Sequence, residues 1–168
     1  MLASAGRDGT IRTWSAQGEP LAAWFGPAGR DVASIALDRS GERLLVHYAE
    51  TEVRLHDART GALLERAERP ASAAAFSPRG DRVALAFAGG RIEVGRSAGD
   101  RAPSTVLEGL GRLTALAFDP GGTLLAAGMK DGRLRVFEVE SRRVVHDSPA
   151  SAAGVVRLLW SPAGDRIL

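Results

Sequence analysis

Histidine is the side chain best suited to acid–base or metal chemistry near neutral pH, and the sequence contains His47, His56 and His146. Aspartate follows two of them directly, as His56-Asp57 and His146-Asp147. Both pairs lie in segments with the pattern of a β-strand, where neighbouring side chains point to opposite faces, so neither aspartate can orient its histidine. The chain has no cysteine and the histidines are scattered. We therefore predict no catalytic residues, no metal site and no cofactor.

Two short motifs also suggest chemistry and are better explained as turns. Segment 109–111 (Gly-Leu-Gly) lacks the third glycine and the strand-to-helix setting of a phosphate-binding loop. Segment 79–81 (Arg-Gly-Asp) spells a cell-adhesion tripeptide, but the corresponding segments 40–42 and 163–165 read Ser-Gly-Glu and Ala-Gly-Asp. Because the residues on either side of the glycine differ among these equivalent positions, we interpret the segment as an ordinary turn between two strands.

Composition indicates a soluble globular protein of 168 residues, with 45 % hydrophobic and 25 % charged residues. Twenty glycines and eight prolines at scattered turn positions favour an all-β fold with many short strands. No apolar run approaches the roughly 20 residues of a membrane span, and no secretory leader is evident. We expect a cytoplasmic protein without a membrane partner. The net charge of +2 is too small to indicate a nucleic-acid partner.

The stretches that carry these residues repeat along the chain. Two apolar runs flank a glycine-containing turn four times, and the turn glycines are Gly41, Gly80, Gly122 and Gly164, at spacings of 39, 42 and 42. A later strand-like run aligns independently at Ile11, Val53, Ile92 and Leu134, at spacings of 42, 39 and 42. Since both sets of positions agree on the period, we infer internal repeats.

Each period has room for four strands, which we name a to d in chain order. Strand a ends at Leu37, Phe76, Phe118 or Trp160, strand b follows the glycine turn, and strand c follows an Asp-Gly-like turn. Strand d is weaker and is expected at 20–26, 62–67, 104–109 and 142–147. A four-stranded antiparallel unit repeated about every 40 residues predicts the blades of a β-propeller.

At the level of motifs the chain resembles the WD-repeat propeller family. Segments 2–16, 77–87 and 119–139 are similar to that family's Ser-Pro-Asp-Gly turn, strand b and Asp-Gly-to-Trp-Asp stretch. The family's terminal Trp-Asp is altered in each repeat, to Trp14-Ser15, His56-Asp57, Gly95-Arg96 and Phe137-Glu138. Its Gly-His before strand a is absent. We therefore expect blades that depend on apolar packing more than on the family's hydrogen-bond network.

The repeats predict one propeller domain over 1–168, with repeat boundaries near 31, 71, 112 and 155. The chain opens within a strand b at Leu2 and ends within another, so four blade-equivalents are expected. A ring of four such blades is unusual for the family. Two chains could instead form an eight-bladed homodimer by exchanging strand a. The alternative interpretation is that the chain is a fragment of a longer propeller. The residues expected in self-association are Leu2, Val156, Leu158 and Trp160.

The resemblance implies that loops at the face where strand a begins bind partners. Large apolar groups beside cations at such loops fit a protein or peptide contact, and the candidates are Arg7, Arg30, Tyr48, Phe87, Arg112, Met129 and Lys130. Trp24 and Phe25 are adjacent in a strand d, so one of the two is expected to be exposed. The predicted function is a non-catalytic interaction scaffold. The alternative is an enzymatic or small-ligand propeller that uses its central channel.

Overall fold

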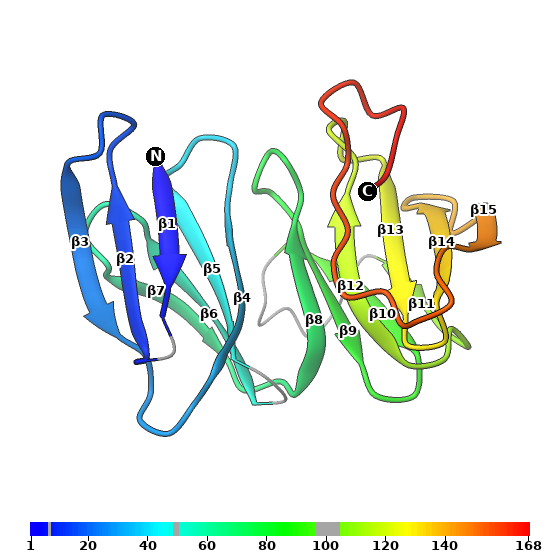
Figure 1. Ribbon diagram of the computed structural model, residues 1–168, viewed down its shortest axis with the longest axis horizontal. Helices are drawn as coiled ribbons and strands as arrows, with labels where there is room; N and C mark the ends of the chain where they lie inside the picture. Colours follow the sequence, from blue (N-terminus) through cyan, green and yellow to red (C-terminus); the bar gives the residue numbers. More distant parts are fainter. Residues whose placement is uncertain (7, 49–50, 97–104) are drawn as a thin grey trace.

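The computed structural model describes residues 1–6, 8–48, 51–96 and 105–168. Every regular element among these residues is a β-strand, and the strands form one three-stranded and three four-stranded antiparallel sheets. Each sheet is built from consecutive strands, and the sheets follow one another in chain order along an open arc (Figure 1). The all-β fold and its division into blades are therefore confirmed.

The first blade has three strands and the other three have four. Blade 1 contains β1 (Leu2–Ala5), β2 (Thr10–Trp14) and β3 (Pro20–Phe25), and blade 2 contains β4 (Val32–Leu37), β5 (Arg43–Tyr48), β6 (Glu52–Asp57) and β7 (Leu63–Ala67). Blade 3 contains β8 (Ala71–Phe76), β9 (Val83–Phe87), β10 (Arg91–Gly95) and β11 (Thr105–Leu107). Blade 4 contains β12 (Leu113–Phe118), β13 (Leu124–Met129), β14 (Arg133–Glu138) and β15 (Val144–Pro149).

The turns between strands a and b stack from blade to blade. Gly122 has φ +74°, a conformation that side-chain-bearing residues rarely adopt, and a Cβ placed there would lie 3.4 Å from Cδ of Pro78 in the preceding turn. Gly164 has the same φ and the same 3.4 Å distance to Pro120. Glycine provides the backbone turn and proline provides the contact for the next glycine, which explains why this short motif recurs.

The core lies in the contacts between consecutive blades, which we call seams. The repeated aromatics Phe76, Phe118 and Phe137 are buried in these seams, at 9, 8 and 2 % exposure. The seam between blades 3 and 4 holds the largest buried cluster, which includes Phe118, Leu125 and Phe137. These three rings therefore belong to the blade-to-blade core.

The C-terminal segment differs from its predicted strand a. Residues 156–160 form no ladder, and the one bridge in the segment joins Trp160 to Ile167 in a small hairpin. The segment instead packs on the face of blade 4 that points away from blade 3, where Val155 and Leu158 join a cluster with Leu134 and Val136. Blade 1 and this segment lie at opposite ends of the arc, so the chain does not close on itself (Figure 1).

Candidate functional site

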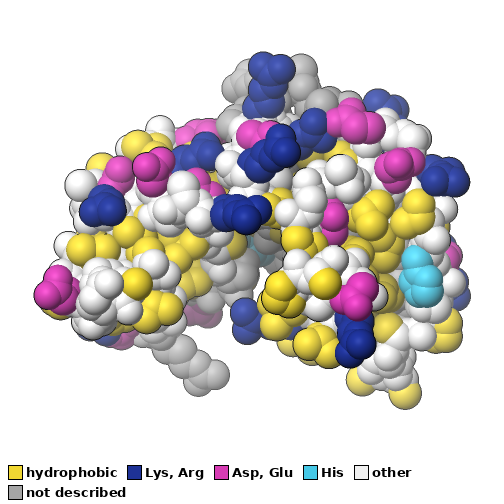
Figure 2. Space-filling view, turned by 90° about the horizontal axis from the view of Figure 1, so that it is seen from above, with side chains coloured by type: hydrophobic (Ala, Val, Ile, Leu, Met, Phe, Trp, Pro, Cys, Tyr) yellow, Lys and Arg dark blue, Asp and Glu magenta, His cyan; other side chains and the backbone are white. Residues whose placement is uncertain are grey.

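Loops from all four blades lie at the end of the molecule where strand a begins, shown at the bottom of Figure 1. We call this end the lower face. It consists of the turns β1–β2, β5–β6, β9–β10 and β13–β14 and the connections β3–β4, β7–β8 and β11–β12. The opposite end, the upper face, carries the stacked a–b turns. Seen from above in Figure 2, its basic and acidic side chains are interspersed rather than separated.

Three predicted cations of the lower face are exposed. Arg112 and Lys130 are neighbours, since the Lys130 backbone N–H donates to the Arg112 carbonyl at 2.8 Å. Arg30 lies on the β3–β4 connection of the first blade. None of the three makes an ion pair with a described residue. Arg7, also predicted here, lies outside the described residues.

Two predicted contact residues are interior residues in the structure. Tyr48 is fully buried at 0 % exposure and Met129 is 2 % exposed. Tyr48 sits opposite Glu52 in the β5–β6 ladder and points into the seam with blade 1, while Met129 belongs to the core between blades 3 and 4. Neither side chain offers surface to a partner, so the interpretation of these two as exposed contacts is corrected.

Phe87 is half-buried and already has a partner within the chain. The Arg69 guanidinium lies 4.5 Å from the centre of the Phe87 ring, within cation–π range, and also pairs with Glu93. Arg91 holds the other Glu93 oxygen at 2.8 Å. A partner at this position would meet an arginine-covered ring.

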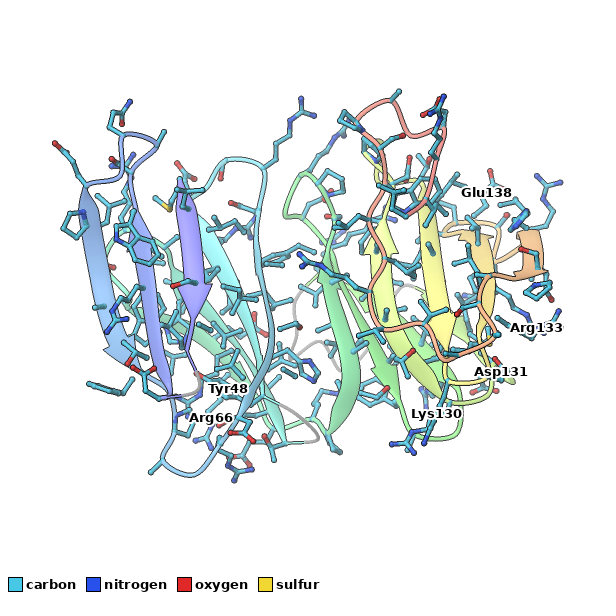
Figure 3. The ribbon with its side chains drawn as sticks, viewed as in Figure 1. Tyr48, Arg66, Lys130, Asp131, Arg133 and Glu138 are labelled. Atoms are coloured by element: carbon cyan, nitrogen blue, oxygen red, sulfur yellow. The ribbon has the colours of Figure 1, made fainter. Side chains whose placement is uncertain are left out.

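A second carboxylate in the interior is held by two arginines on blade 2. Glu52, whose side chain is 4 % exposed, accepts from Arg54 at 3.1 Å and from Arg66 at 2.6 Å. Burial alone would raise the pKa of Glu52, but the hydrogen bonds from Arg66 and Arg54 outweigh it and hold the pKa below its usual value. Figure 3 shows Arg66 beside Tyr48 at the lower face. The arrangement is structural, since the carboxylate is enclosed.

A pocket of about 450 Å³ opens on the lower face of blade 1. The Phe25 side chain, 75 % exposed, forms one wall, whereas its neighbour Trp24 packs in the seam with blade 2. The expectation that one of this pair is exposed is confirmed. The lining residues run along the β1–β2 turn and the β3–β4 connection: Asp8, Gly9, Phe25, Gly26, Pro27, Ala28, Gly29, Arg30 and Asp31.

The histidines lie apart in the fold. His47 and His56 are buried at 2 and 3 % exposure, and burial lowers the pKa of each. His56 Nδ1 lies 3.0 Å from the Gly61 carbonyl, while the adjacent Asp57 accepts backbone bonds from its own turn. The described residues contain no group of three or more potential metal ligands and no helix that could span a membrane.

The residues predicted for self-association fall into two environments. Leu2 and Val156 are 59 and 88 % exposed. Leu158 is 7 % exposed because it packs on blade 4, and the Trp160 indole N–H donates to the Ala117 carbonyl at 3.1 Å. The exposed pair remains available to a second chain, whereas Leu158 and Trp160 already contact their own blade.

Sequence reasoning missed Asp8 and Asp31 as pocket residues. The Gly26 backbone N–H donates to the Gly9 carbonyl at 2.9 Å, which extends the β2–β3 pairing and places the β3–β4 connection beside the β1–β2 turn. Asp8-Gly9 occupies the same place in its repeat as Asp131-Gly132, so the turn itself was visible. The exposed Phe25 beside it was the other available signal.

Comparisons with known proteins agree with this architecture. Residues 74–163, more than half of the chain, match the family model of the anaphase-promoting complex subunit 4 WD40 domain. The β-propeller domain of Cps50 (Swd1) from Myceliophteria thermophila superposes with a TM-score of 0.76 at 19 % identity, over 98 % of this chain and 57 % of that domain. This likeness shows a shared fold.

Curated relatives match over unequal lengths. WD repeat-containing protein VIP3 of Arabidopsis thaliana is 26 % identical over 187 positions, which cover the whole chain and 58 % of that protein. Centriole proteome protein 16 of Chlamydomonas reinhardtii is 49 % identical over 43 residues, 26 % of this chain and 2 % of that protein. SEC12-like protein 2 of Arabidopsis thaliana is 40 % identical over 58 residues, 34 % of this chain and 15 % of that protein. The chain thus spans less than two thirds of the length of each relative. Because the family model matches more than half of the chain and the strands form the expected blades, the chain belongs to the WD40 family of WD-repeat β-propellers.

Proposed function

We propose that the chain is a non-catalytic scaffold that binds a protein or peptide through its lower face. The observation that carries the proposal is an open pocket on the face that loops of all four blades form, together with exposed cations at both ends of that face. Arg30, Arg112 and Lys130 are exposed there without an ion pair to a described residue. Families built of WD repeats typically act as such scaffolds, which supports the proposal.

The innermost strands favour this function over an enzyme that works in the central channel. None of the side chains of β4, β8 and β12 that are not fully buried is ionisable: they are apolar or carry a hydroxyl, as at Ser34, Ala74 and Thr114. Channel chemistry would need ionisable groups converging from several blades. The proposal keeps the cytoplasmic location expected from the sequence, with no nucleic-acid or membrane partner.

We further propose that two chains form an eight-bladed homodimer in which each covers the uncovered first blade of the other. Leu2 occupies the repeat position of Leu44, Val83 and Leu125, whose exposures are 0, 2 and 0 %, yet Leu2 is 59 % exposed. One edge of β1 pairs with β2, and the other pairs with no described strand. An open edge with an apolar face favours strand addition, and the exposed Val156 marks the segment that would be donated.

The scaffold is tested by selecting peptides from a display library against the intact chain and measuring their affinity for two charge-reversal variants. Arg112→Glu with Lys130→Glu should weaken binding about tenfold or more, because both cations flank the lower face. Arg39→Glu with Arg79→Glu, at exposed positions of the upper face, is the matched control and should leave binding unchanged. Selected peptides that respond only to the control pair would refute the lower-face assignment.

Light scattering across concentrations tests the homodimer. A stable mass of two chains is expected, and Leu2→Arg should return it to one chain. Leu64→Arg, at a 54 % exposed position on β7, should leave the mass unchanged. A wild-type mass of one chain at all concentrations would rule the dimer out while leaving the scaffold proposal intact.

A further inference from the structure

The blade 1 pocket combines an aromatic wall with two carboxylates. Phe25 lies opposite Thr10 in the β2–β3 ladder, and the Thr10 backbone N–H donates to Asp8 Oδ1 at 2.9 Å. Asp8 and Phe25 line the same pocket. Asp31 lines the pocket from the β3–β4 connection. The ring and the two acids come from three different segments of blade 1.

The pocket lining carries one net negative charge, from Asp8 and Asp31 against Arg30. Arg12 lies close enough to act on Asp8 as a further positive charge, so the carboxylates and the aromatic ring, rather than the net charge, are the groups that would hold a cation. The hydrogen bonds from Thr10 hold the pKa of Asp8 below its usual value, so this carboxylate is ionised at neutral pH. The face of an exposed aromatic ring attracts cations as well. Within this chain, arginine lies over Phe76, Tyr48 and Phe87, whereas Phe25 has no such partner among the described residues.

The loop that lines the pocket packs against a buried tyrosine on its inner side. Tyr48 packs against Gly26, and a Cβ at Gly26 would lie 2.8 Å from the Tyr48 hydroxyl. The Tyr48 side chain is fully buried, and its hydroxyl has no hydrogen-bond partner among the described residues. This close packing leaves room only for glycine at position 26 and fixes the loop that lines this side of the pocket.

We propose that this pocket binds a positively charged side chain, arginine or lysine, of the peptide or protein that docks on the lower face. The inference rests on the proposed scaffold function and specifies what the partner must carry. The cation would lie over the Phe25 ring between the Asp8 and Asp31 carboxylates. Arg30, at the edge of the same pocket, repels that cation and limits its affinity, which gives the site a predicted response to each charge change.

The test is an NMR titration of the ¹⁵N-labelled intact chain with Nα-acetyl-arginine amide and with its neutral isostere, Nα-acetyl-citrulline amide. The arginine compound should shift the amides of Gly9, Gly26 and Gly29. Citrulline should bind about fivefold more weakly, because an exposed cation–π contact and exposed ion pairs together give about that factor. Equal binding of the two compounds, or arginine shifts confined to another blade, would overturn the inference.

Variants of the pocket residues test whether the pocket binds a cation and whether Asp8 and Phe25 hold it. Asp8→Asn keeps the acceptor for the Thr10 N–H but removes the charge, and it should weaken arginine binding about twofold to fivefold. Phe25→Ala should weaken it similarly, whereas Leu64→Ala, at a position of comparable exposure on β7, should not. Arg30→Gln should strengthen binding by a similar factor; weaker binding would mean that the pocket takes an anion.

The outcomes separate this inference from the scaffold proposal. If arginine fails to bind the pocket while library peptides still lose affinity on reversal of Arg112 and Lys130, the pocket inference fails and the scaffold stands. If arginine binds the pocket but no peptide binding depends on the lower-face cations, the pocket stands and the scaffold proposal fails in its present form.

Discussion

The seam between blades 1 and 2 differs in chemistry from the seam between blades 3 and 4. The latter is a continuous apolar cluster in which Phe118, Leu125 and Phe137 are at most 8 % exposed. The former has a smaller buried cluster around Ile11, Leu44 and Val46. It also contains five buried polar atoms without a partner among the described residues, on Thr13, Trp24, Tyr48, Arg54 and His56.

The comparison shows that one repeat pattern can give seams of unequal strength. The loss of the family's Gly-His led us to expect apolar packing throughout. That expectation holds between blades 3 and 4, but Trp24 and His56 meet between blades 1 and 2, with ring centres 5.0 Å apart. Each unpaired buried polar atom costs about 1–3 kcal/mol. We therefore predict that the blade that carries the pocket is held less firmly than blades 3 and 4.

The largest expected loss of stability comes from a change in the seam between blades 3 and 4. Phe137→Ala should destabilise the chain by about 3–5 kcal/mol, since it removes a 2 % exposed ring and leaves a cavity. Phe25→Ala is the matched control, because that ring is 75 % exposed and its loss should change stability by about 0.5 kcal/mol or less. Urea denaturation measures both, and equal losses would mean that the two phenylalanines do not differ in role.

A smaller loss is expected where a buried carboxylate joins two arginines. Glu52→Gln should destabilise the chain by about 1–3 kcal/mol, because it leaves the Arg54 charge without its partner. The loss is limited because Arg66 is 47 % exposed and water can solvate its charge. Glu68→Gln removes a 73 % exposed partner of the same Arg66 and should have little effect. A loss from Glu68→Gln as large as that from Glu52→Gln would contradict the distinction.

Acidification should weaken the seam between blades 1 and 2, which contains His56, before it affects Glu52. Burial lowers the pKa of both His47 and His56 below the ordinary histidine value, so the unfolded chain binds protons more readily and stability falls as pH drops below about 6.5. The lowered pKa of Glu52 adds a loss below about 4.5, as its carboxylate becomes protonated. Denaturation midpoints between pH 8 and 4 should therefore fall in two stages. In His56→Gln the first stage should shrink, and an unchanged profile would remove His56 from the explanation.

The smallest expected change has the opposite sign. Tyr48→Phe removes a buried hydroxyl without a hydrogen-bond partner among the described residues and should leave stability unchanged or raise it by up to about 1 kcal/mol. Thermal denaturation is a suitable measurement. A loss of more than about 1 kcal/mol would show that the hydroxyl is bonded in solution.

Blade number, strand order and turns could be predicted from the sequence because each depends on local periodicity. Gly122 and Gly164 marked turns, and alternating apolar residues marked strands. The environments of Tyr48 and Met129 could not be predicted, since both stand at a strand end where the neighbouring blade decides burial. The pocket was not predicted either, because most of its lining comes from the β3–β4 connection, whose path has no periodic pattern in the sequence.

The central claim is that a weakly held first blade carries the pocket while blades 3 and 4 form the rigid part of the scaffold. Hydrogen–deuterium exchange of the free chain, resolved by segment, tests it most directly. The amides of β2 and β3 should exchange together and at least about tenfold faster than those of β9 and β13, which corresponds to a difference in opening free energy of about 1.4 kcal/mol. Equal protection of β2, β3, β9 and β13 would contradict the claim.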